Sequence, residues 1–94
     1  MVQKKVREGI HVEDDVILNN YAKLGRAIVM QAVKDYVTAR ERLKMFPGNG
    51  VALAVAKRTL AFFKSSWMSL LAPDINGDAL VEAINRKKGF RNEI

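Results

Sequence analysis

Hydrophobic residues recur every three or four positions through the first half of the chain. From Asp14 to about Met45 there is no proline, and residues that favour helix formation dominate. The recurring positions are Tyr21, Gly25, Ile28, Val29, Ala32, Val33, Tyr36, Ala39 and Leu43. This spacing predicts a long amphipathic helix. A helix of roughly thirty residues would span about 45 Å, so we expect a break near Asn19-Asn20 or Gly25.

The clearest interruption of the helical pattern is Phe46-Pro47-Gly48-Asn49-Gly50. Proline and glycine here predict a sharp reversal of the chain, and Asn49 is suited to cap the next helix. Residues 51–64 then form a second helix with a stripe of core positions. That stripe consists of Leu53, Ala56, Leu60, Phe63 and, one step further on, Trp67. The pattern predicts an antiparallel helical hairpin.

The stretch from residue 60 to 71 contains two of the four Phe and the only Trp, so we expect it to form the centre of the core. Ser65 or Ser66 is expected to cap a short helix over 67–71. The residues expected to converge are Phe62, Phe63, Trp67, Leu70 and Leu71. Replacing a buried Trp67 by Ala should cost about 3–5 kcal/mol, whereas a surface position would make Trp67 a binding residue.

The last third of the chain predicts one more short helix. Ala72-Pro73 ends the third helix, and Asp74 or Asn76 is expected to cap a final helix over 79–87. Its inward positions are Leu80, Val81 and Ile84. The predicted organisation is a loosely ordered arm (1–13), a single helical domain (14–87) and a frayed basic tail (88–94). The predicted fold is an all-α small bundle with a long helix, an antiparallel hairpin partner and two short closing helices.

Composition limits the chemistry that the chain can perform. There is no Cys, which excludes disulfides and thiolate metal sites, and His11 is the single His. No apolar run approaches the roughly 18 residues that would span a bilayer. We therefore expect a soluble, cytoplasmic protein with no membrane partner.

Two acidic clusters invite a metal-binding interpretation. Residues 74–78 resemble the opening of a calcium loop, but position twelve of such a loop falls on Asn85, where a bidentate Glu is required. Glu13, Asp14 and Asp15 are consecutive, so their side chains fan out around a helix. No phosphate loop or nucleophile motif is present in the sequence. We expect neither an enzyme nor a cofactor.

The net charge is +6 with a pI of about 9.9, which suits a nucleic acid or an acidic protein surface as partner. Met30 and Val37 lie on the same helix side as the first three of the candidate basic residues. The candidates for partner or nucleic-acid binding are Lys23, Arg26, Lys34, Arg40, Arg42, Lys44, Lys57, Arg58 and Lys64. The alternative interpretation is a solvated helical face that only aids solubility. A helix–turn–helix motif is disfavoured, because the third helix is short and apolar.

Three blocks of the sequence resemble a group of short helical proteins encoded by phages and integrative mobile elements of Gram-positive bacteria. The blocks are residues 27–36, Phe62-Phe63-Lys64-Ser65-Ser66-Trp67 with Leu70-Leu71, and Gly77-Asp78-Ala79-Leu80-Val81. The likeness covers residues 20–86, and residues 1–19 lie outside it. It brings no catalytic residues and implies an accessory protein of a mobile element.

Three functions follow as hypotheses. The first is a non-enzymatic protein that binds and modulates a nucleic-acid-handling complex, for instance an anti-CRISPR or other anti-defence inhibitor. The second is a direct DNA- or RNA-binding module in phage replication, packaging or regulation, with affinity that falls steeply with salt. The third is a structural homo-oligomer that uses Met30, Val37 and Met68.

Overall fold

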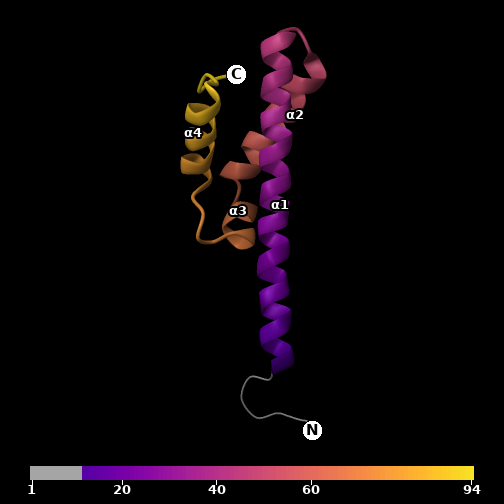
Figure 1. Ribbon diagram of the computed structural model, residues 1–94, viewed down its shortest axis with the longest axis vertical. Helices are drawn as coiled ribbons and strands as arrows, with labels where there is room; N and C mark the ends of the chain where they lie inside the picture. The colour runs from indigo at the N-terminus through magenta and orange to yellow at the C-terminus, as the bar shows by residue number, and fades with distance from the viewer. Residues whose placement is uncertain (1–11) are drawn as a thin grey trace.

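The computed structural model describes the backbone of residues 12–94 and the side chains from residue 22 on. Over this range the chain forms four α-helices and no strand. They are α1 (Val12–Met45), α2 (Gly50–Lys64), α3 (Ser66–Leu71) and α4 (Gly77–Lys88). Helix α2 runs back along α1, and α3 and α4 close the bundle (Figure 1). The predicted all-α bundle is confirmed.

Helix α1 is continuous through Asn19-Asn20 and Gly25, where we expected a break. Its 34 residues correspond to about 51 Å of helix. Gly25 serves close packing, because a Cβ at this position would collide with the backbone carbonyl of Leu71 in α3. Towards its N-terminal end α1 extends past the other three helices (Figure 1).

Asparagine side chains start two of the helices, as predicted. Oδ1 of Asn49 accepts the Ala52 N–H at 3.0 Å, and Oδ1 of Asn76 accepts the Ala79 N–H at 3.0 Å. The start of α3 differs from the prediction. Ser65 holds the capping position, but its hydroxyl donates to the Phe62 carbonyl at 2.7 Å and caps nothing in α3.

The core gathers around Tyr36, which is fully buried in α1. Its ring meets Phe63 of α2 edge-on, with centroids 6.2 Å apart, and Phe90 in the same manner at 6.3 Å. Such edge-to-face pairs add to the stabilisation that burial alone provides. The buried members of this cluster are Val29, Tyr36, Phe63, Met68, Ala72 and Phe90, with Leu80, Val81 and Ile84 of α4 packed against it.

Trp67 is not in the core, and the prediction that it is buried was wrong. Its side chain is 64% exposed, and Leu70 is 73% exposed. Ser65 adopts an extended conformation (φ −83°, ψ 163°) between α2 and α3, which breaks the helical register that placed Trp67 in line with Phe63. Met68 therefore turns inward in its place.

The predicted frayed tail over 88–94 is wrong at Phe90, which is 8% exposed. Helix α4 ends at Gly89 in the left-handed conformation (φ 72°), which glycine adopts without strain. The Phe90 N–H then donates to the Asn85 carbonyl at 2.9 Å, and the turn directs the phenyl ring back onto Tyr36. The folded part of the chain thus extends beyond the predicted boundary at residue 87.

Several predictions fall where the structure gives no description. Residues 1–11 of the expected arm, with His11, lie outside the described residues, and so do the side chains of Glu13, Asp14 and Asp15. Helix α1 already begins at Val12, inside the expected arm. None of the helices in residues 12–94 combines the length and apolar character that crossing a membrane requires.

Candidate partner-binding surfaces

The nine basic residues singled out from the sequence do not form one patch. Lys23, Lys34, Arg42, Lys57 and Lys64 are exposed. Arg26 is exposed too, but its guanidinium pairs with the Asp74 carboxylate at 3.1 Å and ties the loop before α4 to α1. Exposed pairs of this kind contribute about 0–1 kcal/mol, so Arg26 is held only weakly.

Two of the predicted residues lie at a depression between α1 and α2. Arg42 of α1 and Arg58 of α2 line one depression of about 390 Å³ between these helices. Asp35 lines the same depression and offsets part of their charge. This is therefore a mixed surface with a modest excess of positive charge.

Arg40 is the clearest correction among the predicted residues. Its side chain is 7% exposed, so it cannot belong to an exposed basic face. Its guanidinium donates to the Tyr36 hydroxyl at 2.7 Å and to the Arg91 carbonyl at 2.6 Å. Arg40 lies four residues after Tyr36, on the buried stripe of α1, and this spacing was the signal in the sequence for its burial.

Lys44 lies near the same cluster, with Nζ 5.4 Å from the centre of the Phe90 ring. The sequence analysis placed Lys88 and Arg91 in a tail and did not count Arg86 or Lys87 among the candidate binding residues. The last turn of α4 contains Arg86, Lys87 and Lys88, and Arg91 follows it. The C-terminal ends of α1 and α4 lie at the same end of the bundle (Figure 1), so these residues lie at the end that contains Arg42 and Lys44. Among them, Arg86 lies 3.8 Å from the Glu82 carboxylate. We call this group the basic end.

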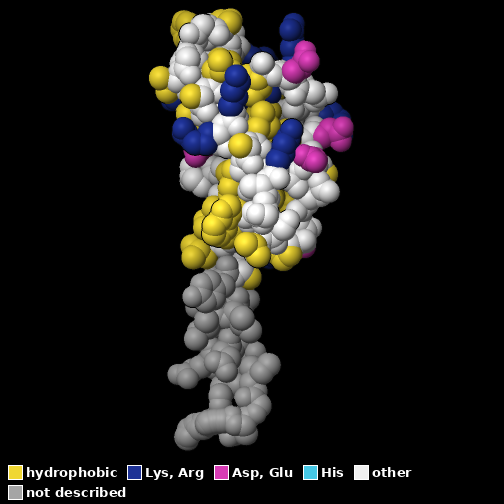
Figure 2. Space-filling model, turned by 180° about the vertical axis from the view of Figure 1, so that it is seen from behind, with side chains coloured by type: hydrophobic (Ala, Val, Ile, Leu, Met, Phe, Trp, Pro, Cys, Tyr) yellow, Lys and Arg dark blue, Asp and Glu magenta, His cyan; other side chains and the backbone are white. Residues whose placement is uncertain are grey.

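A second candidate surface consists of exposed apolar residues near the crossing of α1 and α3. Leu24 and Ile28 are one turn apart on α1 and flank Gly25, where α3 crosses closely at Leu71. Trp67 and Leu70 are the exposed apolar residues of α3. We call these four residues the Trp67 face. Figure 2 shows hydrophobic side chains gathered beside the grey residues, whereas Lys and Arg side chains spread over the opposite end.

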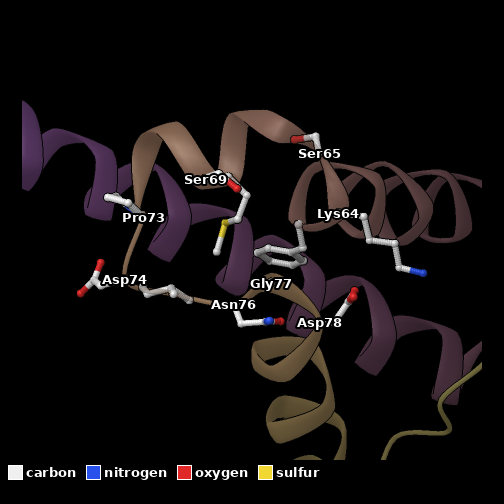
Figure 3. A pocket seen from close by; sticks show the side chains of 11 residues that line it. Lys64, Ser65, Ser69, Pro73, Asp74, Asn76, Gly77 and Asp78 are labelled. Atoms are coloured by element: carbon white, nitrogen blue, oxygen red, sulfur yellow. The ribbon is translucent and has the colours of Figure 1, made fainter.

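A polar cavity of about 450 Å³ lies between the end of α2, α3 and the start of α4. Lys64 and Asp78 lie at one end of it and Asp74 at the other (Figure 3). The Asn76 side chain is occupied in capping α4, and the Ser65 hydroxyl bonds to the Phe62 carbonyl. Lys64 and Asp78 do not form an ion pair, since the ion pairs among residues 22–94 are Arg26 with Asp74 and Arg86 with Glu82. The arrangement resembles a capped loop, with no nucleophile and base in contact.

Two of the three residues proposed for a homo-oligomer interface are not at the surface. Met68 is 2% exposed, and Val37 packs against the core, so neither is available to a second copy of the chain. Met30 remains exposed on the side of α1 away from Ile28.

Comparison with known proteins gives no kinship: the chain matches no protein-family model, no curated protein and no solved structure.

Proposed function

We propose that the chain is a non-enzymatic binding protein that docks through the Trp67 face onto a protein of a nucleic-acid-handling complex. The observation that carries the proposal is the exposure of the only Trp, which is 64% exposed on α3 with Leu70, where α3 crosses the part of α1 that exposes Leu24 and Ile28. Exposed tryptophan among apolar neighbours is the residue type that most often dominates protein interfaces. A modulator encoded by a phage or mobile element, such as an anti-CRISPR or other anti-defence inhibitor, is the concrete form of this proposal.

The separation of the two surfaces supports a nucleic-acid-handling partner. The basic end lies away from the Trp67 face, along the length of the bundle (Figure 1). A protein held by the Trp67 face would therefore present Arg42, Lys44 and the α4 lysines to whatever lies beyond the docking site. Positive charge at that distance attracts phosphate without being part of the protein contact.

The test uses purified CRISPR effector complexes and other phage-defence nucleases, each with its guide or substrate nucleic acid. Because this chain contains a single Trp, 5-fluorotryptophan incorporated into it gives one ¹⁹F NMR signal that reports on Trp67 beside an unlabelled partner, and docking should shift that signal. Trp67→Ala should weaken binding by roughly thirtyfold or more, as expected for the loss of an interface hot spot. Phe46→Ala is the matched control, because Phe46 is 63% exposed at the tip of the α1–α2 hairpin.

Equal losses in Trp67→Ala and Phe46→Ala would contradict docking through the Trp67 face. Failure to bind any of the complexes would remove the proposed partner class. Both variants are checked by circular dichroism, so that unfolding cannot imitate a loss of binding.

A second candidate function is direct binding of DNA or RNA, and the basic end favours it. Six Lys and Arg residues lie in or just after the last turns of α1 and α4: Arg42, Lys44, Arg86, Lys87, Lys88 and Arg91. Direct binding requires that log affinity falls linearly with log salt, and that each lost phosphate contact reduces the slope by about 1. Lys87→Gln/Lys88→Gln should flatten this dependence, whereas Trp67→Ala should leave it unchanged. Salt-independent binding, or none, would exclude this function.

A further inference from the structure

Arg40 is a buried cation without an anionic partner among the described residues. Both of its hydrogen bonds go to neutral oxygens, the Tyr36 hydroxyl and the Arg91 carbonyl. In residues 22–94 the ion pairs within 4.0 Å are Arg26 with Asp74 and Arg86 with Glu82, and Arg40 takes part in neither. A charge that is 93% buried normally has a carboxylate beside it, because its removal from water is costly.

Aromatic rings supply part of the missing compensation. The guanidinium carbon lies 5.0 Å from the centre of the Phe90 ring and 5.6 Å from that of Tyr36. Such contacts stabilise a cation but leave its net charge in place. A guanidinium also has five N–H donors, of which the two hydrogen bonds use two. The Arg40 guanidinium therefore retains N–H donors and a positive charge with which to bind an anion.

Arg40 lines a cavity of about 480 Å³ at the end of the bundle where α1 and α4 end. This volume falls within the roughly 300–1,000 Å³ of small-molecule sites. The apolar wall comes from Leu43 of α1, Leu53 of α2 and Phe90. No other cavity described above combines a buried, unpaired cation with an apolar wall.

The charges around the cavity favour a negatively charged ligand. Three cationic side chains line it, namely Arg40, Lys44 and Arg91, against one acidic side chain, Glu93. An arginine fork matches the two oxygens of a carboxylate with parallel hydrogen bonds. The apolar wall disfavours a doubly charged phosphate, since each additional charge must lose its water. The ligand that fits is a monoanion with an apolar body.

We propose that this cavity binds a small aliphatic carboxylate, whose head group pairs with the Arg40 guanidinium and whose chain lies against Leu43, Leu53 and Phe90. The site is independent of the proposed docking face, because it lies at the other end of the described bundle (Figure 1). Binding to the folded state alone would also raise the melting temperature of the protein.

The experiment titrates the full chain with octanoate below its micelle concentration and follows the side-chain NMR signals of Arg40 and Phe90. Acetate lacks the chain and octanamide lacks the charge, so each removes one half of the proposed recognition. We expect saturable shifts with octanoate, and at least tenfold weaker binding of acetate and octanamide. Equal binding of octanoate and octanamide, or no saturable shift with octanoate, would overturn the proposal.

Variants locate the site. Arg40→Met keeps an unbranched apolar side chain but removes the guanidinium, and should weaken octanoate binding by about ten- to a hundredfold, the range expected for a lost charge-assisted hydrogen bond. If Arg40→Met does not fold, Leu53→Trp tests the same site by filling the apolar wall, and should abolish binding. Lys57→Gln removes an exposed charge of α2 outside the cavity and should bind as the parent does.

A hydrophobic peptide with a free C-terminal carboxylate forms the last arm of the titration. If the peptide binds and octanoate does not, the cavity is a site for a protein terminus and the small-molecule proposal is wrong. Retention of octanoate binding in both folded Arg40→Met and folded Leu53→Trp would likewise place the ligand elsewhere.

Discussion

The hydroxyl of Tyr36 donates a hydrogen bond to Oδ1 of Asn85 across 2.6 Å in the core, and so joins the long helix α1 to α4. The same hydroxyl oxygen accepts a hydrogen bond from Arg40 at 2.7 Å. One phenol thus satisfies two buried polar groups. Helix α4 makes few other polar links to α1 in the described part of the chain, so this chain of hydrogen bonds fixes how the two helices meet.

Tyr36→Phe should lower the free energy of unfolding by about 1–3 kcal/mol, because it leaves buried hydrogen-bonding groups on Asn85 and Arg40 without a partner. Urea denaturation followed by circular dichroism measures the loss. The double variant Tyr36→Phe/Asn85→Leu removes one of the stranded groups, and should be less destabilised than the sum of the two single variants. Strict additivity would show that the hydrogen bond does not couple the two side chains.

Trp67→Ala should cost less than about 1 kcal/mol, because the indole is largely in water already. Phe63→Ala, four residues earlier and 2% exposed, should cost about 3–5 kcal/mol. Urea denaturation of the two variants side by side gives the comparison. A loss of several kcal/mol in Trp67→Ala would return Trp67 to the core and remove the main support for the docking face.

The contrast between Phe63 and Trp67 shows how much of the fold can be predicted from the sequence. Hydrophobic spacing located the helices and the Tyr36 stripe, since spacing within one helix fixes which side chains share a face. The spacing gave the wrong result for Trp67, because we assumed that the helical register of α2 continues through Ser65. The extended backbone of Ser65 instead rotates α3 relative to α2. Backbone angles of a single linking residue leave no trace in hydrophobic periodicity.

The predictions that Phe90 lies in a frayed tail and that Arg40 is exposed were wrong for different reasons. A glycine followed by an apolar residue at the end of a helix is a signal of a chain that folds back, so Gly89-Phe90 was readable in principle. Arg40 was grouped with the exposed basic residues because Lys and Arg usually lie at the surface. Its spacing from Tyr36 indicated the buried stripe of α1, but the residues that cover it, Phe90 and Arg91, come from a segment about fifty residues away and meet it only in the folded bundle.

Gly25→Ala tests the close crossing of α1 and α3. The new methyl group would collide with the Leu71 carbonyl, so we expect a loss of about 1–3 kcal/mol despite the better helix propensity of alanine. Gly50→Ala is the matched control, because Gly50 is also helical and a Cβ there meets nothing within 4 Å. Thermal unfolding should show Gly50→Ala unchanged or more stable. Equal stability of the two variants would contradict the tight crossing.

The helix starts give a third comparison. Asn76→Ala should cost about 1 kcal/mol, since it removes the oxygen that accepts the Ala79 N–H. Ser65→Ala should cost less, although it also stands before a helix. The Phe62 carbonyl that accepts the Ser65 hydroxyl also accepts the Ser65 N–H at 3.1 Å, so the substitution leaves it bonded. Urea denaturation measures the loss of unfolding free energy in both variants. A larger loss in Ser65→Ala than in Asn76→Ala would contradict this expectation.

Phe90→Ala tests whether the C-terminal segment belongs to the folded domain. It removes a buried ring that packs on Tyr36 and lies under the cations of Arg40 and Lys44, so we expect a loss of about 3–5 kcal/mol. Ile94→Ala is the control, because Ile94 is 42% exposed at the end of the chain and should cost less than about 1 kcal/mol. Hydrogen exchange adds a local measurement. The Phe90 amide bonds to the Asn85 carbonyl and should be protected in the parent and exchange quickly in Phe90→Ala. Rapid exchange of this amide in the parent would mean that the segment is a free tail and that Arg40 is open to solvent.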